Sequence, residues 1–140
     1  MTTAQSPLTA HGQDVAVFVQ HWYDILSSHE PVEDLLPYVI DDGLEMAFPE
    51  RTLRGHADFR DWYTAVGESF GPQSHIVERL RTDEHDGLVD VEVTVVWTAK
   101  NLSDGGVSAL RIDQSWQLVR DPADGTLRIR TYRVGDLNPA

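Results

Sequence analysis

Four polar side chains in the second half of the chain are the ones best suited to chemistry: His75, Arg111, Asp113 and Tyr132. Burial in an apolar pocket raises the pKa of an aspartate, whereas a neighbouring arginine lowers it. A carboxyl group poised in this way acts as a general acid or base, and a histidine titrates near neutral pH without tuning. A tyrosine donates a hydrogen bond to a developing oxyanion. We therefore interpret Asp113 and His75 as acid–base groups, oriented by Arg111 and Tyr132.

These residue types suit proton transfer at a carbon next to a carbonyl group, as in isomerisation, dehydration or aldol-type cyclisation. The set contains no evident nucleophile, and the sequence contains no phosphate-binding glycine loop. The histidines lack the spacing of metal ligands and cysteine is absent, so we predict neither a metal site nor a cofactor. The alternative is that these polar side chains simply face solvent, with Asp113 and Arg111 forming a surface pair of little energetic weight.

The elements that must position these residues are four long strands between Gln73 and Val134. Asp-Gly turns at 84–87, 103–106 and 121–125 separate the strands, and this dipeptide is a strong hairpin signal. Apolar and polar residues alternate between the turns, as expected for strands with one buried face. The strands are about a dozen residues long, roughly twice the usual length, and long antiparallel sheets twist and coil. The sequence therefore predicts a curved meander.

The strand register follows from the turns, because the residue numbers of paired residues in an antiparallel hairpin have a constant sum. Sums of about 171, 207 and 245 place apolar residues opposite apolar residues in the three hairpins, for example Trp97 opposite Leu110 and Trp116 opposite Ile129. One end of the other face then carries a largely uncharged set: His75, Val77, Thr94, Val96, Arg111, Asp113, Tyr132 and Val134. An apolar lining with few polar groups is typical of a small-molecule site, so we predict that this face is the concave one.

The residues before Gln73 supply the helices that close the predicted site. Apolar residues at helical spacing predict helices over 14–26 and 57–70, with a very short helix between Pro31 and Pro37. Residues 43–50 and 51–54 predict short strands, the first at a sheet edge because Pro49 cannot donate a hydrogen bond. Core packing is the ordinary role of aromatic side chains on such elements. The candidate substrate-contacting residues are Trp22, Phe48, Trp62, Tyr63, Thr94 and Trp97.

The composition limits the class of protein. A chain of 140 residues is long enough for one domain, which we place at residues 13–136 after a flexible tail at 1–12. The net charge of -12, with Lys100 the single lysine, argues against binding of nucleic acid or an anionic membrane. The sequence shows neither a signal peptide nor an apolar run of membrane-spanning length. We therefore expect a cytoplasmic protein.

The order of predicted elements resembles the nuclear transport factor 2-like superfamily and, within it, the SnoaL-like polyketide cyclase group. The local patterns that carry the resemblance are Val19–Tyr23, Leu53–His56, Ser74–Val77 and Ile112–Asp113. The resemblance covers residues 14–134 and implies an α+β fold, in which a cone-shaped, curved antiparallel sheet wraps around three helices. Members usually bury one sheet face against a second copy, which implies a homodimer with Arg79 and Glu92 near that surface.

The resemblance also implies roles for particular residues. Asp113 is similar in position to the oxyanion-stabilising aspartic acid of ketosteroid isomerases, and His75 to the catalytic histidine of scytalone dehydratase. Trp22 and Phe48 stand where ketosteroid isomerases have a tyrosine and the base aspartate, so steroid isomerase activity is not expected. The superfamily contains enzymes, binding modules and assembly domains. The resemblance thus implies an acid–base enzyme for an apolar, carbonyl-containing substrate, with a non-catalytic module for hydrophobic-ligand binding or dimerisation as the alternative.

Overall fold

The structure, a computed structural model, describes the backbone of residues 7–140 and the side chains from Val15 onward. The predicted tail at 1–12 therefore lies partly outside the described residues. Helix α1 (Pro7–Ser28) begins before the expected start at Asp14, and proline is well suited to the first turn of a helix. One face of α1 is buried at helical spacing by Val15, Val19, Trp22, Tyr23 and Leu26.

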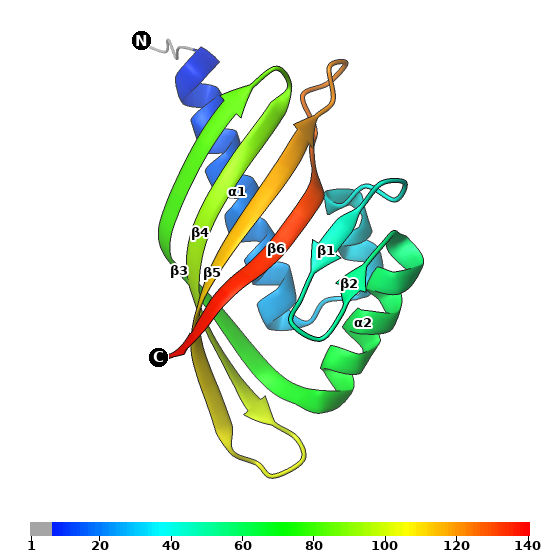
Figure 1. Cartoon of the computed structure of the whole chain (residues 1–140), viewed down its shortest axis with the longest axis vertical. Helices are drawn as coiled ribbons and strands as arrows, with labels where there is room; N and C mark the ends of the chain where they lie inside the picture. The colour runs from blue at the N-terminus through cyan, green and yellow to red at the C-terminus, as the bar shows by residue number, and fades with distance from the viewer. Residues whose placement is uncertain (1–6) are drawn as a thin grey trace.

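The predicted short helix between the two prolines is in fact two 3-10 turns, η1 (Val32–Asp34) and η2 (Leu36–Tyr38). Pro37 explains this, because a proline ring prevents the continuation of a helix through it. Helix α2 (His56–Ser69) confirms the predicted second long helix, and its buried side chains are Phe59 and Tyr63. These helical segments lie on the concave side of the sheet (Figure 1).

The four long strands are confirmed as β3 (Phe70–His85), β4 (Leu88–Asn101), β5 (Val107–Arg120) and β6 (Leu127–Pro139). Two short strands, β1 (Glu45–Ala47) and β2 (Thr52–Leu53), complete a sheet with the order β2-β1-β6-β5-β4-β3. The predicted edge position of β1 is wrong, because β1 pairs with β2 on one side and in parallel with β6 on the other. Pro49 lies beyond the end of β1 and so interrupts no ladder. The predicted α+β fold class is confirmed, with a mixed sheet.

The register between β4 and β5 confirms the prediction, since Trp97 pairs with Leu110 and Val91 with Trp116. The other two long pairings contain irregularities that the prediction missed. Glu78 is an extra residue in β3 between Val77 and Arg79, both of which pair with β4. In β6, Arg130 is an extra residue between Ile129 and Thr131, which pair with two consecutive residues of β5. An extra residue of this kind moves every side chain beyond it to the opposite face of the sheet.

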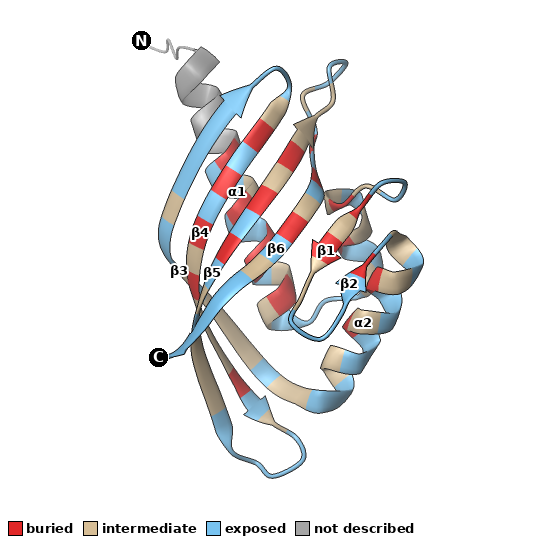
Figure 2. Ribbon diagram, viewed as in Figure 1, coloured by how far each residue is buried: buried red, intermediate tan, exposed pale blue. Residues whose placement is uncertain are grey.

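The predicted composition of the concave face is therefore wrong. His75 pairs with Trp97, and Tyr132 pairs with Trp116, so both lie on the inner face with the apolar residues of β4 and β5. Arg111, Asp113 and Thr94 remain on the outer face. Figure 2 shows the result as buried and exposed positions that alternate along β4 and β5.

The centre of the core is a group of aromatic side chains around Trp22, which is 1% exposed. Its ring lies 5.8–6.2 Å from those of Tyr38, Phe59, Trp116 and Tyr132. Aromatic pairs at such distances stabilise a core beyond the area that they bury. This group fixes α1 against the sheet and α2 against α1.

The outer face of the sheet is charged and nearly balanced in sign. Its charged residues are Glu78, Arg79, Arg81, Asp83, Asp90, Glu92, Arg111, Asp113, Arg128, Arg130 and Arg133. Within the described residues, no helix is both long enough and apolar enough to span a membrane.

Candidate active site

A cavity of about 240 Å³ lies between the inner face of the long strands, the end of α1 and the side of α2. Its lining is mostly apolar. The aromatic residues in the lining are Phe48, Trp62, Tyr63, Phe70, Trp97 and Tyr132. The polar residues in the lining are His29, Glu50, Gln73, His75 and Gln114. An apolar hollow with a few convergent polar groups is the usual form of a small-molecule site.

His75 is the side chain in this cavity that is best suited to moving a proton. Its Nδ1 lies 2.9 Å from Oγ of Ser27 on α1, and its ring stacks on Tyr23 at 5.3 Å. Its Nε2 has no hydrogen-bond partner among the described residues. Burial lowers the pKa of His75 from 6.5 to about 4, so the imidazole is neutral near pH 7. One ring nitrogen is thus held in place, and the other is available for proton transfer.

The lowered pKa of His75 predicts a pH dependence of stability with a definite sign. The unfolded chain protonates this residue near pH 6.5 and the folded chain only near pH 4, so the unfolded state holds more protons in between. Stability therefore rises with pH through this window. We expect wild type to lose roughly 3 kcal/mol of unfolding free energy relative to His75→Gln between pH 7 and pH 4, measured by urea unfolding.

A matched control for this comparison is His85→Gln. Asp90 raises the pKa of the exposed His85, so its contribution is present at low pH and is lost as the pH rises through the folded-state pKa. The two variants should therefore change the pH dependence in opposite directions. An unchanged pH dependence in His75→Gln would show that this imidazole is not buried in solution.

Gln114 is the second polar centre of the cavity. Its Oε1 accepts hydrogen bonds from the hydroxyl of Tyr23 at 2.7 Å and from Nε1 of Trp116 at 3.0 Å. Burial raises the pKa of Tyr132 to about 12, although nearby polar groups on Trp22, Gln114 and Tyr23 oppose the rise. Burial also raises the pKa of Tyr23. Both phenols are therefore protonated hydrogen-bond donors at neutral pH.

The structure brings most of the predicted site residues together. His75, Tyr132, Phe48, Trp62, Tyr63 and Trp97 all line the cavity. Trp22 does not; it lies in the core behind the lining, where it contacts Tyr132.

The predicted placement of Asp113, Arg111 and Thr94 in the pocket is wrong, because all three lie on the outer face of the sheet. Oγ1 of Thr94 donates to Asp113 at 2.8 Å, and Arg111 donates twice to Glu78, at 2.8 and 3.2 Å. Asp113 and His75 are therefore separated by the sheet.

Sequence reasoning missed Ser27 and Gln114, and it considered Tyr23 only as one of the helix aromatics whose ordinary role is core packing. A signal for Gln114 was present, because it is the polar member of the inner stripe Ile112, Gln114, Trp116 and Leu118. Ser27 is separated from His75 by 48 positions and by several elements, so no local pattern links them.

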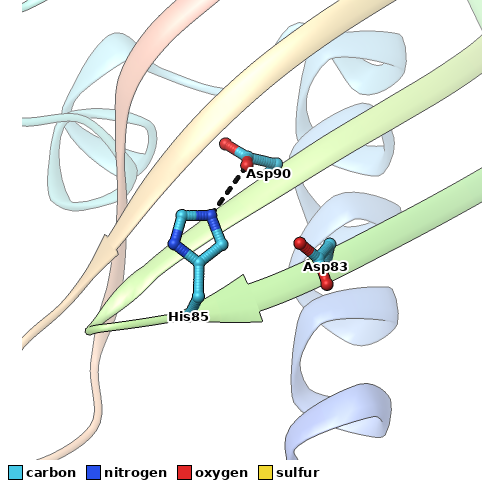
Figure 3. A group of neighbouring side chains, drawn as sticks. All are labelled: Asp83, His85 and Asp90. Carbon is cyan, nitrogen blue, oxygen red and sulfur yellow. Dashed lines mark hydrogen bonds and ion pairs between the residues drawn. The ribbon is translucent and has the colours of Figure 1, made fainter.

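A separate cluster of Asp83, His85 and Asp90 lies near the turn between β3 and β4 (Figure 3). The ligand atoms lie within 4.8 Å of one another, and both carboxylate and imidazole are metal-ligand types. Nε2 of His85 lies 2.9 Å from Oδ2 of Asp90, and this ion pair explains their proximity. The cluster is on the outer face, so the sheet separates it from the cavity.

Comparisons with known proteins give matches in structure alone. No protein-family model and no curated protein sequence matches the chain. A nuclear transport factor 2-like superfamily protein from Salmonella enterica superposes with a TM-score of 0.83 at 15% identity, covering 95% of this chain and 94% of its own.

Two further solved structures carry the names of enzymes. A proposed scytalone dehydratase from Novosphingobium aromaticivorans has a TM-score of 0.80 at 12% identity, over 94% of this chain and 89% of its own. A hexachlorocyclohexane dehydrochlorinase of type 3 from Novosphingobium barchaimii has a TM-score of 0.73 at 13% identity, over 94% of each chain. These likenesses extend over nearly the whole molecule, and the chain therefore has the fold of the nuclear transport factor 2-like superfamily.

Proposed function

We propose that the protein is an acid–base enzyme that acts on a small, apolar, carbonyl-containing molecule bound in the cavity. The observation that carries the proposal is His75: a neutral, partly buried imidazole within an apolar lining, with Nδ1 held by Ser27 and with no partner for Nε2 among the described residues. A general base needs these properties, since it must be unprotonated, fixed in direction and shielded from water.

The chemistry begins with removal of a proton from the carbon next to the carbonyl group. His75 takes the proton, the C–H electron pair forms a C=C bond, and the carbonyl oxygen becomes an oxyanion. Tyr132 remains protonated and donates a hydrogen bond to that oxygen. Return of the proton to another carbon gives isomerisation, and departure of a leaving group from the β-carbon gives elimination.

Two structural neighbours support a reaction of this class. Their names, dehydratase and dehydrochlorinase, denote loss of water and of hydrogen chloride, and both reactions remove a proton from carbon. Attack of the same enolate on a second carbonyl group would give the aldol-type cyclisation of a polyketide. The proposed isomerisation, elimination and cyclisation all begin with removal of a proton from the carbon next to the carbonyl group, so one assay of proton removal tests them together.

The experiment uses 1-tetralone, a bicyclic ketone small enough for the cavity, in deuterated buffer. Proton NMR follows the exchange of the protons next to the carbonyl. We expect exchange with the protein to exceed that with free imidazole at the same concentration, because the cavity holds ketone and base together. Ketone that binds without faster exchange would contradict the enzyme proposal.

The second candidate is a protein that binds hydrophobic molecules without turning them over. One observation favours it: the hydrogen-bond partner of His75 among the described side chains is a serine, and no carboxylate orients the ring. If the protein only binds its ligand, 1-tetralone should bind, but its protons should exchange no faster than they do in buffer without the protein.

We also propose that the outer face of the sheet binds a second copy of the chain. Arginines and carboxylates are nearly balanced there, whereas the whole chain has a net charge of -12. Two copies that meet through another surface bring net negative charges together, whereas this face offers arginine opposite carboxylate. The exposed Ile76, on the same face, adds apolar area to the contact.

The homodimer proposal is tested by charge reversal. Arg81→Glu on the outer face should weaken dimerisation by about tenfold or more, because it places like charges in the contact. Arg60→Glu on α2 is the matched control and should leave the dimer intact. Analytical ultracentrifugation over a range of concentrations measures both. A wild-type monomer at all concentrations would contradict the proposal.

A further inference from the structure

We infer that Gln114 selects the ligand: the cavity binds molecules that present a hydrogen-bond acceptor, such as a ketone or lactone oxygen, to Nε2 of Gln114. Molecules of the same shape without an acceptor are disfavoured. The inference rests on the proposed function in placing the ligand in the cavity, and it adds the feature by which the ligand is recognised.

The orientation of the Gln114 amide is fixed by its neighbours. Both Tyr23 and Trp116 donate to the same oxygen, Oε1, at 2.7 and 3.0 Å. An indole N–H is a donor only, so a flipped amide would direct its NH2 group at Trp116 and lose this bond. The oxygen therefore faces Tyr23 and Trp116, and the nitrogen is directed elsewhere.

The nitrogen of this amide has donor capacity left over. Gln114 is 7% exposed and is the buried polar residue of the described core, yet it also lines the cavity. Its NH2 group carries two donors, and the nearby hydroxyl of Tyr132 can accept one of them. The second N–H is then available to the cavity. An N–H that lies on the wall of an apolar cavity competes poorly for water, so a ligand that supplies an acceptor gains a hydrogen bond and affinity there.

The same arrangement discriminates between ligands. Tyr23 and Tyr132 keep their protons at neutral pH, since burial raises both pKa values. The hydroxyl of Tyr132 and the amide nitrogen of Gln114 thus offer donors to the cavity, while the hydroxyl of Tyr23 already donates to Oε1, the acceptor of the amide. Sites built to hydrogen-bond one group reject analogues that lack it more strongly than apolar pockets reject changes of size.

Tyr23 connects this group to the proposed base. Its hydroxyl donates to Gln114, and its ring stacks on the imidazole of His75 at 5.3 Å with an interplanar angle of 19°. Tyr23 thus contacts both side chains, so a carbonyl oxygen bound at Gln114 lies near the imidazole that removes the proton.

The first test uses wild-type protein and three bicyclic probes of similar size. 1-Tetralone carries an acceptor, tetralin carries no polar atom, and 1,2,3,4-tetrahydroquinoline carries an N–H donor. Quenching of tryptophan fluorescence reports binding, because Trp62 and Trp97 line the cavity. We expect 1-tetralone to bind about tenfold or more tightly than either of the others. Tetralin is the most hydrophobic, so equal or tighter binding of tetralin would overturn the inference.

The second test changes the direction of the hydrogen bond. Gln114→Glu keeps an oxygen for Tyr23 and Trp116 and replaces the NH2 group with a second acceptor. We expect its affinity for 1-tetralone to fall by about tenfold or more and its relative preference for tetrahydroquinoline to rise. Gln117→Glu, on the same strand but outside the cavity, is the matched control and should bind like wild type. Undiminished 1-tetralone affinity in folded Gln114→Glu would overturn the inference.

The outcomes separate this inference from the proposed function. Selective 1-tetralone binding without proton exchange supports the role of Gln114 and rejects the enzyme. Proton exchange that depends on His75, without selectivity at Gln114, supports the enzyme and rejects the role of Gln114. If no probe binds to wild type, both are rejected. The probe series with wild type does not depend on the folding of any variant.

Discussion

His75→Gln is expected to lower the exchange of the protons next to the carbonyl of 1-tetralone by a factor of about 10²–10⁴. Glutamine retains a hydrogen-bonding side chain of similar reach but cannot accept a proton at neutral pH. The affinity for 1-tetralone should change little, because the apolar lining and Gln114 are unaltered. The pH profile adds a second readout: wild-type exchange should be level above about pH 5 and fall as the pH drops through about 4, where His75 becomes protonated.

Asp113→Asn is the control for this experiment. The sheet separates Asp113 from the cavity, and its carboxylate accepts from Thr94 on the outer face. Its exchange rate should equal that of wild type. The opposite result, with loss of exchange in Asp113→Asn and full activity in His75→Gln, would place the chemistry on the outer face and reject the proposed site.

Trp22→Ala is expected to produce the largest loss of stability, about 3–5 kcal/mol of the free energy of unfolding. Trp22 is 1% exposed, and its ring contacts those of Tyr38, Phe59, Trp116 and Tyr132, so its removal leaves a cavity among groups from α2, η2 and the sheet. Urea unfolding followed by circular dichroism measures the effect. A folded variant that loses less than about 1 kcal/mol would show that the core repacks around the missing ring.

Trp62→Ala provides a matched comparison, because it deletes the same side chain from the cavity wall. Trp62 is half-buried and stacks on Phe48 at 4.5 Å. Its removal should cost less stability than that of Trp22 and should weaken 1-tetralone binding. The pair thus separates a tryptophan that holds the elements together from one that contacts the ligand.

Much of the fold follows from the sequence because its signals are local. The Asp-Gly turns, the alternating strands and the helical stripes each depend on neighbouring residues, and the structure confirms them. The pairing of β4 with β5 was predicted residue by residue because this hairpin contains no irregularity. The site depends instead on the extra residues in β3 and β6. A register in which the residue numbers of each pair have a constant sum assumes that neither strand contains an extra residue.

The irregularities do leave a trace in the sequence. Glu78 and Arg79 are consecutive polar residues that interrupt the alternation of β3, and Arg130 and Thr131 do the same in β6. A search for such interruptions would have moved His75 and Tyr132 to the inner face. The contact between Ser27 and His75, by contrast, requires knowledge of how α1 crosses the sheet.

The parallel pairing of β1 with β6 has a consequence for the order in which the chain can fold. Residues 45–47 find their partners at 131–133, near the end of the chain. Contacts so distant in sequence form slowly, because closing a long loop costs chain entropy. During synthesis on the ribosome, the N-terminal half emerges long before the strand against which β1 docks. Phe48, directly after β1, takes its place in the cavity wall only when this pairing forms, so the binding site cannot be completed before residues 131–133 have emerged.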